Sequence, residues 1–131
     1  MSKFESVWIV DDDNIHQFFA TKSLNHLKIT DRILPFLDGD LALNTIKKII
    51  VDKAELPDVI FLDINMPNMD GWEFMDEFNK IADGITKKIL IFIVSSSIAD
   101  ADRNRAKSYP NVTDFLIKPI LPDTLKMAFG L

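Results

Sequence analysis

The sequence has 131 residues, 47% of them apolar and 27% charged, and its 20 acidic and 15 basic side chains give a net charge of −5 at pH 7. This length fits one domain with a self-sufficient core, the composition excludes a disordered chain, and the acidic balance argues against nucleic acid or an anionic membrane as the main partner. The chain has no cysteine for disulfides, thiolate metal sites or nucleophilic catalysis, and its longest apolar run, residues 89–94, is far too short to span a bilayer. We expect a single soluble domain over residues 1–131, located in the cytoplasm because the first residues carry no secretory signal.

The N-terminal half of the chain alternates between short apolar runs and segments of helical period. Val7–Val10 is a continuous apolar run of strand length that stops at three consecutive aspartates. A helix capped by Asp13 or Asn14 is expected next, with apolar residues recurring at Ile15, Phe18, Phe19, Leu24 and Leu27. Residues 32–36 form a weaker strand candidate, in which Pro35 points to a sheet edge, where a missing N–H costs least. A second helix is expected from residues 38–40 to residue 50.

The C-terminal half continues the alternation with three more strands and three more helices. Strands are expected at 59–62, 89–94 and 113–117, and the run at 89–94 is apolar enough to be buried on both faces of a sheet. A loop rich in turn formers, residues 65–71, leads into a helix over residues 72–82. The helix expected over residues 99–107 is poor in apolar residues and should be lightly anchored, and a last helix is expected over 122–129.

Five strands that alternate with helices, each strand a continuous apolar run, predict an α/β fold. The sheet should be parallel and covered by helices on both faces. In such sheets ligands bind beyond the carboxyl ends of the strands. The polar residues found there are Asp11, Asp12 and Asp13 after the first strand, Asp63 after the third, Ser95 and Ser96 after the fourth, and Lys118 after the fifth.

These strand ends place carboxylates, a hydroxyl and an ammonium group at one edge of the expected sheet. Clustered carboxylates raise one another's pKa unless a cation is present, and hard oxygen ligands without sulfur favour Mg²⁺. A carboxylate beside Mg²⁺ and a lysine is suited to attack on phosphorus, because both cations offset charge on the transferring group. Taken singly, each residue has an ordinary explanation as a helix cap, a strand terminator or a surface charge. Their order and their common edge favour a site.

More specific motifs lie in four segments: Trp8-Ile9-Val10-Asp11-Asp12-Asp13, Phe61-Leu62-Asp63 continuing to Asp70-Gly71, Ile93-Val94-Ser95-Ser96, and Phe115-Leu116-Ile117-Lys118-Pro119. On these motifs, the sequence resembles the receiver domains of two-component response regulators over nearly its whole length. The stretch Met66-Pro67-Asn68-Met69-Asp70-Gly71 is the most specific part of the match. The resemblance implies a single flavodoxin-like (βα)5 domain, with a doubly wound parallel sheet of five strands in the order 2-1-3-4-5.

The resemblance implies a role for each acidic residue of the motifs. Asp63 matches the phosphoacceptor of the family. Asp11 and Asp12 match the acidic pair that holds Mg²⁺ together with Asp63, and Asp12 is favoured as the direct ligand. The backbone carbonyl of Asn65, two residues after the acceptor, matches a further metal ligand.

Three other positions match the switching machinery of receiver domains. Ser95 matches the hydroxyl that turns toward the phosphoryl group. Lys118 matches the lysine that pairs with a phosphoryl oxygen, and the bond from Lys118 to Pro119 is often cis in the family. Phe115 occupies the aromatic switch position but lacks the hydroxyl of a tyrosine, so switching there must work by packing.

The resemblance also implies that this chain is a signalling switch and not an enzyme, although it would assist its own phosphorylation and dephosphorylation. It implies two kinds of partner as well. A histidine kinase or a histidine phosphotransfer protein would donate the phosphoryl group. The face formed by residues 99–107, 113–117 and 122–129 would be read by a downstream protein or by a second copy of the chain. Since the sequence ends soon after the last expected helix, a stand-alone receiver and one excised from a longer protein are both open.

Two other functions compete with the switch. Phosphotransferases of the haloacid-dehalogenase type also use an aspartate nucleophile with Mg²⁺, but they need a second aspartate two residues on as general acid. Asn65 stands at that position and cannot carry the proton. A receiver-like interaction module that no longer needs phosphate should have lost Asp63, Lys118 or the acidic pair, and all of them are present.

No cofactor other than Mg²⁺ is expected. The loop after the first strand is rich in aspartate and would repel a flavin phosphate. The two histidines of the sequence, His16 and His26, fall on roughly opposite sides of the first expected helix and are interpreted as ordinary surface or packing residues. The phenylalanines are assigned to the core.

Overall fold

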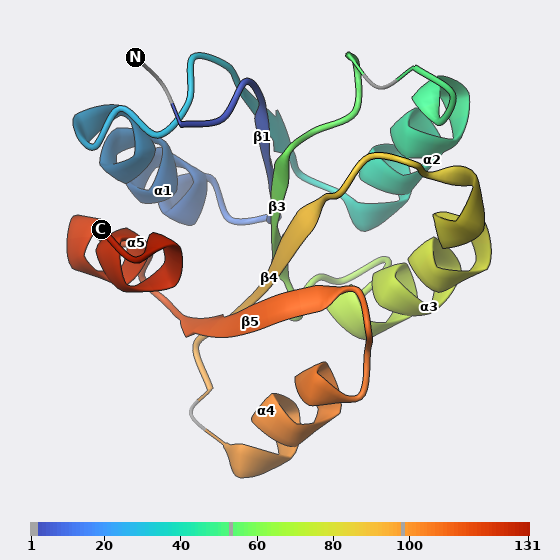
Figure 1. The fold of residues 1–131 in the computed structure, drawn as a ribbon. Coiled ribbons are helices and arrows are strands. Elements are labelled where there is room, and N and C mark those ends of the chain that lie inside the picture. Colours follow the sequence, from blue (N-terminus) through green and yellow to red (C-terminus); the bar gives the residue numbers. More distant parts are fainter. Residues whose placement is uncertain (1–2, 53, 98) are drawn as a thin grey trace.

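The computed structural model describes residues 3–52, 54–97 and 99–131 and shows the expected alternation of strands and helices (Figure 1). The strands are β1 (Val7–Val10), β2 (Ile33–Phe36), β3 (Val59–Asp63), β4 (Leu90–Ser95) and β5 (Val112–Ile117). The helices are α1 (Asn14–His26), α2 (Gly39–Ile49), α3 (Gly71–Ile81), α4 (Asp100–Lys107) and α5 (Pro122–Phe129), and a short 3₁₀ helix, η1 (Ala82–Gly84), follows α3.

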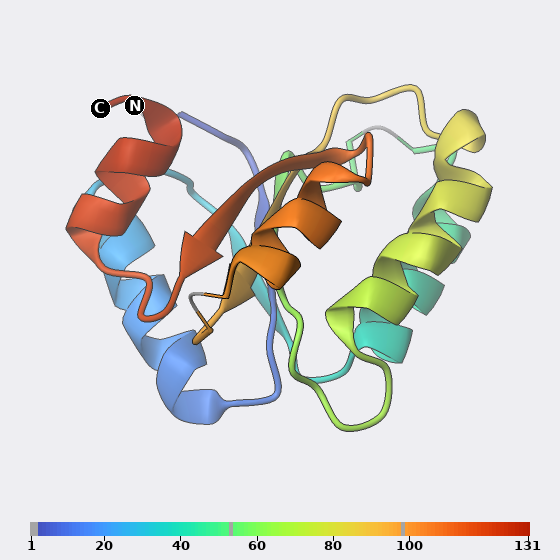
Figure 2. The same ribbon diagram turned by 90° about the horizontal axis from the view of Figure 1, so that it is seen from below.

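The five strands form one parallel sheet in the order β2-β1-β3-β4-β5, which confirms the predicted fold class and strand order. Helices α1 and α5 cover one face of the sheet, and α2, α3 and α4 cover the other (Figures 1 and 2). Strand β2 lies at the edge of the sheet, as Pro35 within it predicted, because a residue without an N–H is tolerated there.

Each interior strand supplies side chains to two separate cores. In β1, Trp8 and Val10 pack into the core under α2 and α3, while Val7 and Ile9 pack into the core under α1 and α5. Strands β3 and β4 alternate in the same way, which explains why their sequences are continuous apolar runs rather than alternating ones.

The register of the strands brings their carboxyl ends to one edge. Val10 of β1 lies opposite Leu62 of β3, Asp63 lies opposite Val94 of β4, and Ser95 lies opposite Ile117 of β5. Residues that follow or end these four strands therefore meet at the same edge of the sheet.

Helix α1 differs from the prediction in the face that it buries. Three of the apolar residues expected on its inner face are exposed, with exposed fractions of 68% for Ile15, 57% for Phe18 and 45% for Phe19. The buried face carries His16, Gln17, Ala20, Ser23 and Leu24. Polar contacts fix this orientation, since Gln17 Nε2 donates to the carbonyl oxygens of Ile9, Asp11 and Phe36 at 2.7, 3.1 and 3.2 Å.

Two arginines of helix α4 lie over aromatic rings of neighbouring elements. Ala106 is the one buried residue of this helix within the described part of the chain, which agrees with the light apolar anchoring expected from the sequence. The Arg103 guanidinium lies 5.4 Å from the ring centroid of Phe115 in β5, and that of Arg105 lies 4.7 Å from the ring of Trp72 in α3. Cation–π contacts of this kind are weak at exposed sites, so they add little to the light apolar anchoring of α4.

None of the helices in the described ranges combines the length and the apolar character that a bilayer span needs.

Candidate functional site

The site is centred on Asp63, the last residue of β3. Its side chain is 2% exposed, and its two carboxylate oxygens have different partners. Oδ1 accepts a hydrogen bond of 3.0 Å from the backbone N–H of Asn65, and Oδ2 pairs with Lys118 Nζ at 3.1 Å. The Asp63 carboxylate is thus held, where the carboxyl ends of the strands meet, by one backbone donor and one ammonium group.

Lys118 joins Asp63 to the aspartate that follows β1. Its Nζ lies 3.1 Å from Oδ2 of Asp11 as well as 3.1 Å from Oδ2 of Asp63. The backbone holds the lysine there, because the N–H of Lys118 donates to the carbonyl oxygen of Ser95 at 2.8 Å. The next peptide bond, to Pro119, is cis, as the family resemblance suggested.

Asp12 completes a cluster of three carboxylates. It is exposed, whereas Asp11 and Asp63 are buried, and one oxygen from each of the three lies within 4.8 Å of the others. Three hard oxygen ligands that converge beside solvent fit a divalent cation such as Mg²⁺, which keeps several waters when it binds to protein carboxylates. The three carboxylates predicted as metal ligands are therefore close enough to act together.

The two buried carboxylates have opposite pKa shifts. Burial, assisted by the charge of Asp11, raises the pKa of Asp63 from 3.8 to about 6, against the opposing effects of the Asn65 N–H and Lys118. Burial also works to raise the pKa of Asp11, but the hydrogen bonds from His16 and Asp13 and the charge of Lys118 outweigh it and lower that pKa. Two carboxylates that lie close together divide in this way, because the negative charge of one makes ionisation of the other less favourable.

The loop after β3 needs a glycine to bring α3 close to Asp63. A Cβ on Gly71 would lie 2.9 Å from the Asp63 carbonyl oxygen and 2.7 Å from the Ile64 Cα, so any larger residue would displace this backbone. The first turn of α3 is held by Asp70, which caps the helix through a 2.8 Å hydrogen bond from the Glu73 N–H. The specific Asp70-Gly71 motif thus fixes the backbone that follows the central aspartate.

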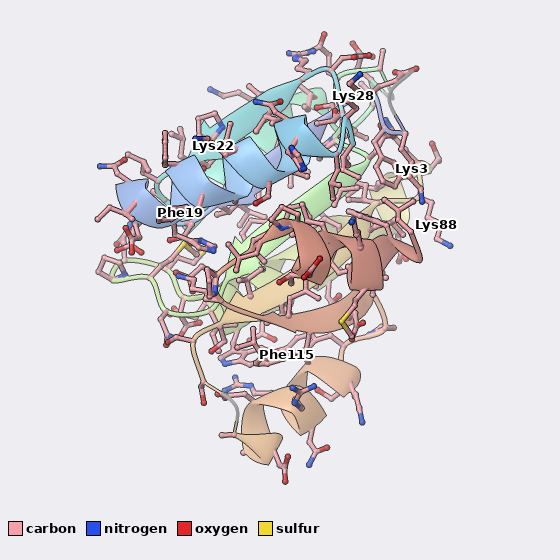
Figure 3. The ribbon with its side chains drawn as sticks, turned by 90° about the vertical axis from the view of Figure 1, so that its left-hand side faces the viewer. Lys3, Phe19, Lys22, Lys28, Lys88 and Phe115 are labelled. Atoms are coloured by element: carbon pink, nitrogen blue, oxygen red, sulfur yellow. The ribbon has the colours of Figure 1, made fainter. Side chains whose placement is uncertain are left out.

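Ser95 and Phe115 lie beside the cluster without joining it. Ser95 is fully buried, and its Oγ accepts a hydrogen bond of 3.0 Å from the Ser97 N–H; among the described residues it makes no hydrogen bond to Asp63. Phe115 is 7% exposed and lies between β5 and α4 (Figure 3). The structure therefore brings Asp11, Asp63 and Lys118 into contact, places a carboxylate oxygen of Asp12 within 4.8 Å of those of the two aspartates, and leaves Ser95 and Phe115 next to them.

His16 is a site residue that the sequence interpretation missed. It is 6% exposed, so it is a packed rather than a surface residue, and its Nδ1 makes a hydrogen bond with Oδ2 of Asp11 that the sequence interpretation did not anticipate. His26, by contrast, is exposed as expected. The sequence feature that could have revealed this contact is the helix cap at Asp13. It places His16 in the first turn of α1, where side chains point back toward the end of the preceding strand.

Known proteins share both this sequence pattern and this fold. Residues 7–129 match the profile of the response regulator receiver domain. The chain belongs to this family. It is 28% identical, over 92% of its length and 76% of the relative's, to the probable methanogenesis regulatory protein FilR2 of Methanothrix harundinacea. It is 30% identical, over 86% of its length, to the sensor histidine kinase CheAY of Helicobacter pylori, of which it spans 13%.

Solved receiver proteins have the same architecture as this domain. A two-component response regulator from Cytophaga hutchinsonii superposes with a TM-score of 0.88 and 27% identity, covering 98% of this chain and 96% of that one. A response regulator receiver protein from Dyadobacter fermentans superposes with a TM-score of 0.76 and 27% identity, over 95% and 98% of the two chains. The receiver domain is a signalling domain of two-component systems rather than an enzyme in its own right.

Proposed function

We propose that this receiver domain, over residues 1–131, is a phosphorylation-driven switch in the cytoplasm. Asp63 accepts a phosphoryl group from a histidine kinase or a histidine phosphotransfer protein, and Asp11, Asp12 and the backbone carbonyl of Asn65 join Asp63 in holding Mg²⁺. The observation that carries the proposal is the position of Lys118 Nζ, 3.1 Å from both Asp11 and Asp63 in a cluster of three carboxylates.

The proposed reaction transfers a phosphoryl group from a histidine nitrogen of the donor to a carboxylate oxygen of Asp63. A carboxylate oxygen of Asp63 attacks the phosphorus of a phosphohistidine, an O–P bond forms as the N–P bond breaks, and the imidazole of the donor leaves. Lys118 pairs with a phosphoryl oxygen as it arrives and releases its contact with the carboxylate. Bound Mg²⁺ would offset the remaining negative charge of the transferring group.

A sensor histidine kinase among the relatives supports a kinase or phosphotransfer partner for this chain. The test uses a small acyl phosphate as a donor, so that no cognate kinase is needed. Intact mass measured after incubation with Mg²⁺ should show one added phosphoryl group, which is lost in base. Without Mg²⁺ the adduct should form far more slowly, and an unmodified protein under both conditions would favour the interaction module instead.

Mg²⁺ should also stabilise the fold of the unmodified protein. Because the cation binds a cluster that only the folded chain assembles, a concentration a hundred times the dissociation constant adds about 2.7 kcal/mol to the free energy of unfolding. Thermal melts with and without Mg²⁺ should therefore differ by several degrees. The difference should vanish in Asp12→Ala and persist in the control Asp123→Ala, which removes an exposed aspartate of α5. A shift of equal size in both variants would place the cation elsewhere.

We further propose that the signal leaves through the face made by α4, β5 and α5. A phosphoryl group on Asp63 would draw the Ser95 hydroxyl away from the Ser97 N–H, which opens space for Phe115 to repack. Helix α4 has one buried residue, so its movement costs little, and a downstream protein or a second copy of the domain would read the changed face.

Hydrogen exchange tests this coupling. A beryllofluoride mimic of the phosphoryl group should change amide exchange across residues 99–118 in the wild type. In Ser95→Ala the mimic should still bind at Asp63 but leave that segment unchanged, because the hydroxyl that links the two is gone. An equal change in both proteins would contradict the route through Ser95.

A further inference from the structure

Asp11 is held by more donors than the other aspartates of the cluster. Its Oδ1 accepts a 2.9 Å hydrogen bond from the Asp13 N–H, and its Oδ2 contacts both Lys118 Nζ, at 3.1 Å, and His16 Nδ1. A carboxylate oxygen has two lone-pair positions. Both positions of Oδ2 are thus used, and Oδ1 keeps one position open.

His16 has little freedom to leave this contact. Asp13 caps the first turn of α1 and accepts hydrogen bonds of 2.9 Å from the Ile15 N–H and 3.4 Å from the His16 N–H. One residue further on, Gln17 ties the helix to the backbone of β1 through its bonds to the Ile9 and Asp11 carbonyls. The backbone on both sides of the imidazole is therefore fixed relative to the strand end that carries Asp11.

Ordinary packing does not account for this histidine. The ring is buried, and its Nε2 has no hydrogen-bond partner within the described residues. A buried ring nitrogen without a partner costs free energy, and an apolar side chain of similar size would fill the same space without that cost. The contact that a leucine could not make is the one from Nδ1 to Asp11.

We propose that His16 is a positioning residue of the acidic site, which holds Asp11 with its Oδ1 available to the bound cation and its Oδ2 directed at Lys118. This role rests on the proposed function, in which Asp11, Asp12 and Asp63 bind Mg²⁺. Partners that orient a metal-binding carboxylate from outside the ligand set commonly change metal affinity when they are removed. His16 therefore acts through Asp11 and touches neither the cation nor the phosphoryl group.

Mg²⁺ affinity measured by calorimetry on two matched variants tests this role. His16→Leu keeps the bulk of the side chain without a donor and should weaken Mg²⁺ binding about tenfold. His16→Asn places an amide N–H at the position of Nδ1 and should stay within about threefold of the wild type. In an Asp11→Asn background, His16→Leu should change the affinity no further, because the carboxylate that it orients is gone.

A second measurement on the wild type needs no variant to fold. Nitrogen NMR of the histidine rings should show a proton on Nδ1 of His16, and its resonances should shift when Mg²⁺ is added. Those of His26, which is exposed at the end of α1, should stay unchanged.

Each alternative outcome has a distinct meaning. Wild-type affinity in His16→Leu, or a loss in His16→Asn as large as that in His16→Leu, would overturn the positioning role while the proposed function stands. An Nδ1 of His16 that carries no proton would overturn it as well. So would His16 resonances that do not shift on addition of Mg²⁺ although calorimetry shows that Mg²⁺ binds. A wild-type protein that binds no Mg²⁺ would overturn the proposed function and, with it, the role of His16.

Discussion

Asp63→Asn should abolish phosphorylation by a small acyl phosphate, whereas the wild type gains the mass of one phosphoryl group. The amide of asparagine cannot supply the anionic oxygen that attacks phosphorus. The neighbouring carboxylates cannot readily replace Asp63. Asp11 is buried with its Oδ2 occupied by Lys118 and His16, and within the described residues Asp12 makes no ion pair with Lys118, the lysine that pairs with the phosphoryl oxygen. The effect expected is complete loss rather than slower reaction.

The control for this experiment is Asp123→Asn. Asp123 is exposed in the first turn of α5, so its loss removes a surface carboxylate from the chain without touching the site. This variant should accept the phosphoryl group as the wild type does. A phosphoryl adduct of equal yield in Asp63→Asn would contradict the assignment of the acceptor.

The same substitution should make the protein more stable when no divalent cation is present. The pKa of Asp63 is raised from 3.8 to about 6, so between these values the folded chain keeps a proton that the unfolded chain has released. The stability associated with this proton is present below 3.8 and is lost as the pH rises through about 6. At about 1.4 kcal/mol for each unit of pKa difference, the ionised Asp63 costs about 3 kcal/mol at neutral pH.

Asp63→Asn removes this cost, because the amide occupies the same space without a charge. Its melting temperature at pH 7.5 without Mg²⁺ should exceed that of the wild type by about 10 °C. Melts at a series of pH values should show the advantage shrinking as the pH falls below 6 and vanishing near pH 4. An advantage that is the same at every pH, or a variant less stable than the wild type at pH 7.5, would contradict the electrostatic origin of the effect.

The strands of this fold were readily predicted from the sequence, because burial on both faces of a parallel sheet requires a continuous run of apolar residues. The runs at 7–10, 59–62 and 89–94 are continuously apolar and correspond to β1, β3 and β4 within one residue at each end. Even the weak run at 32–36 was placed at the sheet edge by Pro35. The strand order, in contrast, came from the family resemblance, since apolar runs do not say which strands are neighbours.

The orientation of α1 was predicted wrongly because apolar spacing was taken as the guide. Phe18 and Phe19 follow a helical period, but a period does not say which side of the helix faces the sheet. The Asp13 cap and the hydrogen bonds of Gln17 to the end of β1 decide that, and they turn both phenylalanines outward. Figure 3 shows Phe19 and Lys22 on α1, and Lys22 Nζ lies 5.3 Å from the ring centroid of Phe18.

The acidic site was more predictable than the contacts that surround it. Residues that end or follow adjacent parallel strands must converge, and Asp11, Asp12, Asp63 and Lys118 do so. The contact of His16 with Asp11 depends on the rotation of α1, so the error that placed Phe18 inside also left this histidine without a role in the site. The hold of Arg103 on Phe115 likewise depends on how α4 docks, which no local pattern in that short polar helix records.

The most direct test of the account identifies the residue that carries the phosphoryl group. Borohydride reduces an aspartyl phosphate to homoserine, and this product survives digestion and peptide sequencing by mass spectrometry. After incubation with the acyl phosphate and Mg²⁺, homoserine should appear at position 63 and at no other aspartate. Homoserine at Asp11 or Asp12, or a phosphoryl group on His16 or His26 with residue 63 unmodified, would contradict it.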